Sequence, residues 1–428
     1  MPESLKISFL RVLPKSAFAR GVGTLAGGTA LAQILPILAM PVLTRLYSPA
    51  DFGVLALYLS CAAVLAVLAT GRYEMAIPLP ADELTAANIA VFTVKLSATV
   101  SLLVLAVVAA FGQPIASLLG DVSLAPWLYF LPLTVFAGGV ISACQFWCNR
   151  RSEYARMAAN RMQVGLVTAL AQIGLGGLGF RGGQVVGAVI GQAFPAAVIA
   201  RSIWHKDQHV FSKTNLAAQI QAAKVYFRHP AHIAPSQLIG VAAGIMPVFI
   251  MTKAYGVAAA GMLALAWKLA ALPTSLVASA IGDVYRQKIA QSYNETGQFK
   301  SIFVRTLSLT TAAAIIPFVL MYFLAPPVFV LVFGEAWREA GTYAQILAVA
   351  AFFQFIFTPV DKGAVVVGAT RYIFAWHAVR MLGMLAVMAA VWTGAWSAVA
   401  AVWMISLLNV SLYVADGLVE YYLSRADN

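Results

Sequence analysis

Apolar residues follow one another along this chain in long runs, separated by short polar stretches. Runs of about 20 apolar residues suit helices that cross the roughly 30 Å hydrocarbon core of a membrane. Strands of a membrane barrel would be shorter and would alternate between apolar and polar positions, so the pattern predicts helices. There are twelve such segments, at about 21–43, 52–70, 86–111, 126–148, 162–180, 183–203, 232–254, 257–280, 305–325, 342–360, 372–393 and 396–415.

The chain also contains an internal repeat. The stretch LTRLYSPADFGVLAL at Leu43–Leu57 returns 208 positions later, without a gap, as MTKAYGVAAAGMLAL at Met251–Leu265. A second echo pairs Leu118–Leu133 with Leu331–Ala348. Six segments, an even number, fall in each half, so we expect the halves to share one orientation and to be related by an axis along the membrane normal.

These patterns predict an all-α integral membrane protein with two six-helix lobes. We place the N-terminal lobe at 1–203, a cytoplasmic linker at 204–230 and the C-terminal lobe at 231–428. Within the linker, Leu216, Ile220, Ala223 and Phe227 recur at helical spacing among cationic positions. This spacing predicts an amphipathic helix that lies on the cytoplasmic face of the membrane.

Composition supports the membrane assignment, because the chain is 61% hydrophobic and only 10% charged. Soluble domains carry about 25% charged residues. With the first segment starting inside, 21 of the 28 Lys and Arg residues fall on one side of the membrane. This asymmetry predicts that both termini are cytoplasmic. It also accounts for the net charge of +12 through apposition to anionic lipid, so we expect no nucleic-acid partner.

Three cations fall inside the predicted spans, where a charge is costly and is usually either paired or functional. Lys268 lies near the middle of the eighth segment, and we predict that it faces a cavity. Lys95 either faces the cavity or extends its own chain toward the membrane interface. Arg380 either belongs to the cavity or pairs with Asp416 of the last segment.

Charged residues also mark the ends of the segments. Arg45 and Lys253 occupy matching positions of the repeat on the outer side, and we favour two cations flanking one anion path over a relic of duplication. On the inner side, Arg72 and Glu74 end the second segment and Asp283 ends the eighth. These groups either form interfacial salt bridges, or the cations bind a phosphate and the carboxylates relay protons.

No constellation of catalytic or metal-binding residues stands out in the sequence. The three cysteines lie in apolar segments without a completing Cys or His pair, and there is no Ser nucleophile elbow. We therefore predict that the protein is not an enzyme and holds no metal or other cofactor.

With these residues in view, the sequence resembles the polysaccharide transporter family of the multidrug/oligosaccharidyl-lipid/polysaccharide (MOP) exporter superfamily. That family includes the Wzx-type O-antigen flippases and the exopolysaccharide translocases. The matching stretches are spread from the first segment to the tenth, at Leu43–Gly53, Gly71–Pro80, Asn149–Arg161, Phe227–Leu238 and Leu331–Ala348.

The resemblance implies alternating access between two lobes in a bacterial cytoplasmic (inner) membrane. The implied cargo is a lipid-linked oligosaccharide, typically on undecaprenyl pyrophosphate, moved from the inner to the outer leaflet, with polysaccharide polymerase or chain-length proteins as possible partners. For the anionic head group we select Arg45, Arg72, Lys253 and Lys268, with Lys95, Arg380 and Gln33 as weaker cavity candidates. For coupling to a H⁺ or Na⁺ gradient the candidates are Glu74, Asp283 and Asp361.

Three other functions remain open. A drug exporter of the same superfamily, similar to the ion-coupled MATE transporters, would want a carboxylate in its cavity, whereas the first segment offers only Gln33. A membrane polymerase of the same pathway would be expected to carry a substantial outer loop, and the outer loops here are short. A scaffold role without transport is the third alternative.

Overall fold

The computed structural model describes residues 17–425, without the side chains of 17–26, 29, 229, 232, 279, 280, 283, 370 and 371. This part of the chain forms helices and no strand. The N-terminal half forms α1 (Ala17–Leu38), α2 (Met40–Leu46), α3 (Pro49–Thr70), α4 (Glu83–Leu119), α5 (Ala125–Leu128), α6 (Leu131–Arg150), α7 (Tyr154–Gly177), α8 (Gly183–Phe211) and α9 (Leu216–Val225). The C-terminal half forms α10 (Ala234–Tyr255), α11 (Val257–Ala270), α12 (Ser279–Thr296), α13 (Lys300–Phe333), α14 (Arg338–Phe357), α15 (Gly363–Val367), α16 (Thr370–Thr393) and α17 (Ala398–Leu423).

Each of the twelve predicted segments has a helical counterpart. Within residues 17–425, nine helices are long and apolar enough to cross a membrane. The remaining three predicted segments correspond to α1 with α2, to α7 and to α11, and the apolar stretches Ala30–Leu46 and Val257–Ala270 are shorter than the nine. The prediction of an all-α membrane protein is confirmed.

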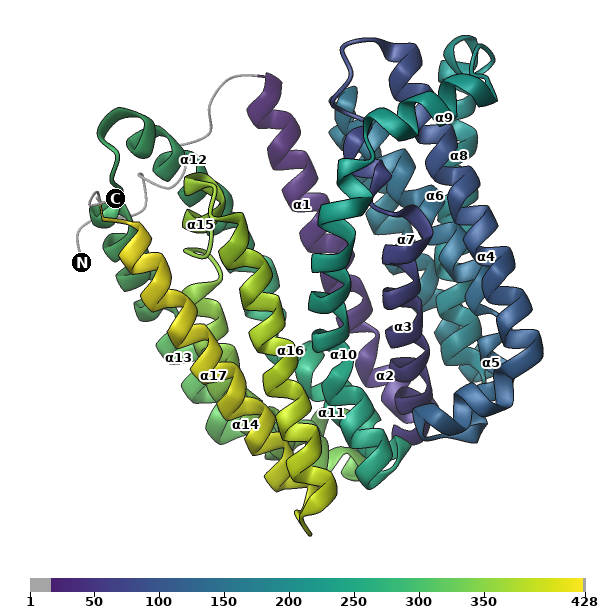
Figure 1. Ribbon diagram of the computed structural model, residues 1–428. Coiled ribbons are helices and arrows are strands. Elements are labelled where there is room, and N and C mark those ends of the chain that lie inside the picture. Colours follow the sequence, from purple (N-terminus) through teal and green to yellow (C-terminus); the bar gives the residue numbers. More distant parts are fainter. Residues whose placement is uncertain (1–16, 426–428) are drawn as a thin grey trace.

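The helices form two groups that converge at one end and diverge at the other (Figure 1). They diverge toward the end that carries α9 and α12, and both described chain ends lie on this side. At the convergent end the indole of Trp337 packs edge-on against Phe52, with ring centroids 4.8 Å apart. The same indole donates a hydrogen bond of 3.1 Å to the carbonyl oxygen of Thr44, so the C-terminal half is anchored on the α2–α3 turn.

The repeated stretches form the turns at this convergent end. Between α2 and α3, Ser48 caps α3 reciprocally with Asp51, since each side chain accepts a hydrogen bond from the other residue's backbone N–H. The matching turn between α10 and α11 uses Gly256 at φ +90° instead. In the second echo, Gly120 and Gly334 occupy equivalent positions and adopt φ +103° and φ +100°. Only glycine enters this region without strain, so both positions favour glycine. The two turns nevertheless differ, because ψ is 0° at Gly120 and 168° at Gly334.

The segment between the halves differs in detail from the predicted linker helix. Helix α8 continues to Phe211, and the separate helix α9 covers Leu216–Val225. Gln219 is buried against the protein, whereas the side chains of Leu216 and Ile220 are 61% and 44% exposed. The apolar stripe of α9 therefore faces away from the protein, as expected of a helix at a membrane interface.

Candidate transport site

Lys268 is an exposed cation on one of the most enclosed helices of the molecule. Its helix, α11, packs against α3, α10 and α14, which come from both halves of the chain. An exposed side chain on a helix surrounded in this way projects into open space rather than into the core. Among the described side chains, no carboxylate forms an ion pair with it. Lys268 is therefore a positive charge without a carboxylate partner, and its predicted place in a transport cavity stays a prediction.

Arg45 and Lys253 both lie at the convergent end, and both are exposed. The Lys253 ammonium donates a hydrogen bond of 3.2 Å to the carbonyl oxygen of Ser117 in the last turn of α4. A cation in this position satisfies a C-terminal carbonyl group and complements the helix dipole. Lys253 thus joins the two halves of the chain, a contact that the sequence did not indicate.

Arg72 and Glu74 pair with each other at the end of α3. The Nη1 atom of Arg72 lies 3.3 Å from Oε1 of Glu74, whose side chain is only 1% exposed. Arg72 adopts φ +61°, a region that residues other than glycine rarely occupy. The Oε2 atom of Glu74 and the Nε atom of Arg72 lack hydrogen-bond partners. This arrangement matches the interfacial salt bridge, one of the two predicted alternatives.

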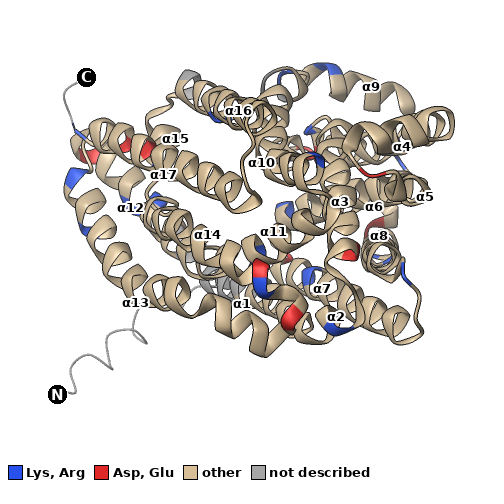
Figure 2. Ribbon diagram, turned by 90° about the horizontal axis from the view of Figure 1, so that it is seen from below, with Lys and Arg blue, Asp and Glu red and all other residues tan. Residues whose placement is uncertain are grey.

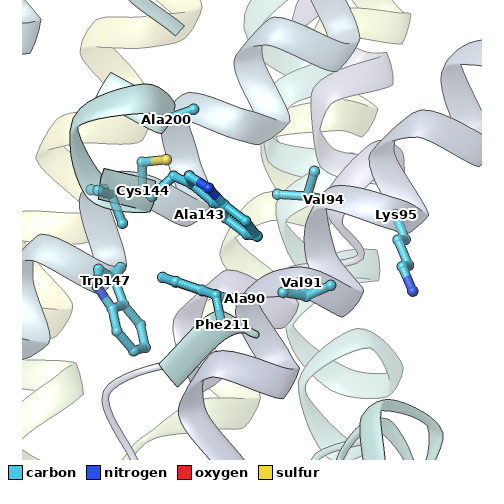
Figure 3. Close-up of a pocket in the computed structure, with 11 residues that line it drawn as sticks. Ala90, Val91, Val94, Lys95, Ala143, Cys144, Trp147, Ala200 and Phe211 are labelled. Carbon is cyan, nitrogen blue, oxygen red and sulfur yellow. The ribbon is translucent and has the colours of Figure 1, made fainter. Parts of the chain in front are cut away.

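Lys95 has a partner far away in the sequence. Its ammonium donates a hydrogen bond of 3.0 Å to Oε1 of Gln219 and so ties α4 to the amphipathic helix α9. Beside it, a cavity of about 350 Å³ lies among α4, α6 and α8 and is almost wholly apolar. Figure 3 shows Lys95 at the edge of this cavity, pointing away from Trp147 and Cys144. The structure therefore joins the side chain of Lys95 to the linker helix α9.

Gln33 and Arg380 are half-buried, on α1 and α16. The predicted alternative in which Arg380 pairs with Asp416 is wrong. The carboxylate of Asp416 accepts a hydrogen bond from the Tyr372 hydroxyl, and the Nε atom of Arg380 lacks a hydrogen-bond partner. Tyr372 lies on the same helix as Arg380, two turns earlier, and so takes the position next to Asp416 that the arginine was expected to fill.

Carboxylates gather at one end of the C-terminal half, where Figure 2 shows acidic residues around α15 and α17. Asp361 binds the Lys362 ammonium, and its charge interacts with those of Asp416 and Glu420. Glu420 is buried and accepts a hydrogen bond of 3.1 Å from the backbone N–H of Ala364, while its Oε2 atom lacks a partner. From this cluster, the sequence indicated only Asp361 as a candidate for ion coupling.

The side chain of Asp283 lies outside the described part of the structure, so its predicted role in ion coupling stays a prediction. Among the described residues, no three His, Cys, Asp or Glu side chains come together as a possible metal site.

Sequence reasoning also missed an ionic network at the divergent end of the N-terminal half. Arg151 forms ion pairs with Glu83 and with the buried Asp207, in the latter case at 3.2 Å. Asp207 also accepts a hydrogen bond of 2.7 Å from the indole N–H of Trp147. The neighbouring Arg150 donates hydrogen bonds to backbone carbonyl groups of the loop before α4, namely those of Pro78, Pro80 and Ala81. The paired arginines were a visible signal, but their partners lie about 60 to 70 positions away in the sequence.

Comparison with known proteins decides the family. A sequence model described as "Polysaccharide biosynthesis protein" matches residues 42–342, which cover both copies of the first repeat and most of the second. The chain belongs to this polysaccharide biosynthesis family. The matched region includes Arg45, Lys253 and Lys268, and it ends before the carboxylates of α17.

One relative of this family member is the succinoglycan biosynthesis transport protein ExoT of Rhizobium meliloti. The two are 22% identical over 356 residues, which cover 81% of this chain and 68% of ExoT. Among solved structures, the lipid II flippase MurJ in an inward closed conformation superimposes with a TM-score of 0.74 at 12% identity, covering 93% of this chain and 90% of MurJ. An inward-facing MATE multidrug transporter of the MOP superfamily superimposes with a TM-score of 0.61 at 14% identity, covering 97% of this chain and 96% of the transporter.

These comparisons confirm both the resemblance and the fold. The structural similarities establish a membrane fold of the type found in MurJ and the MATE transporters, and the family match places the chain among polysaccharide biosynthesis proteins, a group to which the transport protein ExoT is related. The relatives are described as transporters and flippases, which favours a function other than catalysis.

Proposed function

We propose that this protein moves a lipid-linked oligosaccharide, carried on a polyprenyl pyrophosphate, from the inner to the outer leaflet by alternating access. The observation that carries the proposal is the exposed and unpaired Lys268 on α11. A pyrophosphate cannot cross hydrocarbon unaided, and a cation in a hydrated path lowers that cost. Arg45, which is exposed at the convergent end, is the further cation that we assign to this path.

The position of α11 supports the same proposal. This helix packs against α3 of the N-terminal half as well as against its own neighbours α10 and α14. A cation at the junction of the halves stays close to the cargo when the protein changes between its inward-open and outward-open states. We propose that the termini and α9 are cytoplasmic, which makes the described arrangement open toward the inner leaflet.

The second candidate function is the export of small molecules, as in the MATE transporters whose fold this chain resembles. Cationic drugs require carboxylates along the path, and three carboxylates of the C-terminal half, Asp361, Asp416 and Glu420, gather instead near α15 and α17. We propose that this cluster, rather than the paired Glu74, serves coupling to a H⁺ or Na⁺ gradient. Glu420 supports this role, because one of its buried oxygens has no hydrogen-bond partner.

Transfer of a fluorescent undecaprenyl-pyrophosphate oligosaccharide in proteoliposomes tests the proposal. The variant is Lys268→Gln, and the matched control is Lys288→Gln, which removes an exposed lysine of α12. We expect Lys268→Gln to reduce transfer by about tenfold or more, Lys268→Arg to restore part of it, and Lys288→Gln to transfer like the wild type. Equal transfer by Lys268→Gln would refute the site, and dye export without lipid transfer by the wild type would favour the MATE-like exporter.

A further inference from the structure

A second apolar cavity lies on one flank of the molecule, between the two halves. This flank groove has a volume of about 530 Å³. Its lining includes Leu65 of α3, Leu103 and Val107 of α4, and Met246 and Phe249 of α10. Helix α3 lies between α4 and α10 (Figure 1) and packs against both, whereas α4 and α10 scarcely touch. Since residues of all three helices line the groove, α3 forms its floor and the other two helices form its walls.

The lining of the flank groove offers almost nothing to a polar ligand. The hydroxyl of Ser60 donates its hydrogen bond of 2.7 Å to the Ala56 carbonyl of its own helix. The other lining residues are apolar or, in the case of Cys61, carry a thiol. Water gains few hydrogen bonds in such a space, and sugar hydroxyl groups would remain unpaired. A hydrocarbon chain is the ligand that fits.

One end of the groove carries a positive charge. Ile115 and Leu119 in the last turns of α4 line the groove, and Lys253 lies one helical turn beyond Phe249 on α10. The Lys253 ammonium uses one hydrogen bond on the Ser117 carbonyl group between these two positions. An ammonium has three N–H donors, so two remain for another acceptor. An apolar groove that ends at an exposed ammonium is complementary to an anionic lipid.

We propose that the flank groove holds the isoprenoid chain of the lipid-linked cargo, with Lys253 binding a phosphate of its head group. This inference rests on the proposed function and adds a site for the part of the cargo that need not cross the membrane. One wall belongs to the N-terminal half and the other to the C-terminal half, so a movement of the lobes changes the width of the groove. Its occupant is therefore sensitive to the transport cycle, as expected of cargo.

Photo-crosslinking with a diazirine-bearing polyprenyl phosphate in phosphatidylethanolamine–phosphatidylglycerol proteoliposomes tests the proposal. Leu103 and Leu102 are adjacent on α4 and are 61% and 67% exposed, but only Leu103 lines the groove. We expect Leu103→Trp to fill the groove and to reduce labelling of α3 and α10 by about tenfold. Leu102→Trp carries the same indole toward lipid and is expected to leave the labelling unchanged.

Competition separates the tail from the head group. In the wild type, unlabelled polyprenyl phosphate should compete about tenfold better than the uncharged polyprenol, and Lys253→Gln should abolish that preference. Lys288→Gln again serves as the control for loss of a lysine. Phosphatidylglycerol in excess should not displace the probe.

Three results would overturn the assignment: equal labelling of Leu103→Trp and the wild type, even labelling of all the lipid-facing helices, or displacement by phosphatidylglycerol. The last would identify a bilayer phospholipid as the occupant. Each of these results comes from labelling or competition and does not require a transport assay. Cargo transfer without labelling of the groove would refute only the groove, whereas labelling without transfer would refute only the proposed function.

Discussion

Gly53 of α3 and Gly261 of α11 pack so closely that neither position has room for a side chain. A Cβ atom on Gly53 would overlap the carbonyl oxygen of Val257, and one on Gly261 would overlap the carbonyl oxygen of Pro49. All four residues belong to the repeat, in which Pro49 matches Val257 and Gly53 matches Gly261. The contact is therefore reciprocal, and the two copies of the repeat meet each other across a pseudo-twofold axis at the convergent end of the lobes.

A methyl group at this contact should open the convergent end. We expect Gly53→Ala to destabilise the described arrangement of the helices by about 1–3 kcal/mol, because the helices must separate to admit the new atom. This cost shifts the population toward arrangements in which α3 and α11 are apart. Spin labels at the exposed positions Leu46 and Ala254, in a cysteine-free background, would report a longer distance.

Gly244 provides the control for this substitution, because no atom lies within 4 Å of the position where its Cβ would be. Gly244→Ala on α10 should leave both the spin-label distance and the thermal stability unchanged. A distance distribution in Gly53→Ala that matches the wild type would show that the contact does not hold the lobes together.

The ionic network of the N-terminal half should contribute strongly to stability. Asp207→Ala removes the acceptor of both the Trp147 indole and the Arg151 guanidinium and leaves Arg151 without one of its two carboxylate partners. Because Arg151 is 26% exposed and keeps Glu83, the expected cost is that of the lost hydrogen bonds to a buried charged group, about 1.5–3 kcal/mol of unfolding free energy. We expect a clear fall in the melting temperature of the purified protein in detergent.

The exposed pair of Glu335 and Arg338 supplies the comparison, with side chains 69% and 62% exposed. Glu335→Ala should change the unfolding free energy far less than Asp207→Ala, because water screens such pairs. If the two substitutions had equal effects, the network around Asp207 would be no more than a surface feature.

The sequence was sufficient to predict the elements of this fold and insufficient to predict its pairings. Helix length and apolarity are local properties, so the twelve segments and the glycines at 120 and 334 could be read directly from the sequence. The partners of charged residues depend on helix packing over long separations. Lys95 and Gln219 are 124 positions apart, and Tyr372 and Asp416 are 44 apart.

In the candidate site, too, single residues could be predicted from the sequence and their partners could not. The unusual position of Lys268 inside a span was visible in the sequence, because a lysine among apolar residues needs no partner to be noticed. The role of Lys253 on the end of α4 was not visible, since Ser117 becomes its neighbour only through the contact between the halves. The flank groove was likewise hidden, because its two walls lie on α4 and α10.

Lys95→Gln should separate the linker contact from transport. The substitution removes the ammonium that binds Gln219. We therefore expect the unfolding free energy to fall by no more than about 2 kcal/mol and amide hydrogen exchange in α9 to become faster. Because Lys95 points toward α9, transfer of the lipid-linked oligosaccharide should fall much less than in Lys268→Gln. A loss of transfer as large as that of Lys268→Gln, in a folded protein, would assign Lys95 to the cargo path instead.

Asp361 should make stability depend on pH in an unusual direction. The protein around this carboxyl excludes bulk water and raises its pKa above the usual range near 3.9, although the neighbouring Lys362 ammonium opposes the shift. Between the unfolded and the raised folded pKa, the folded state binds more protons. The unfolding free energy contributed by this group therefore rises as the pH falls through that window and declines as the pH rises through the folded pKa.

Melting temperatures between pH 3 and pH 8 would test this direction, with Asp361→Asn expected to remove that component of the profile. Asp82 is the matched control of opposite sign, because hydrogen bonds from the hydroxyl and backbone N–H of Thr85 lower its pKa. The stability that Asp82 contributes is present above its unfolded pKa and is lost as the pH falls through its folded pKa. Asp82→Asn should therefore flatten only the low-pH part of the melting-temperature profile. An unchanged profile in Asp361→Asn would show that another group of the cluster, such as Glu420 or Asp416, binds the proton.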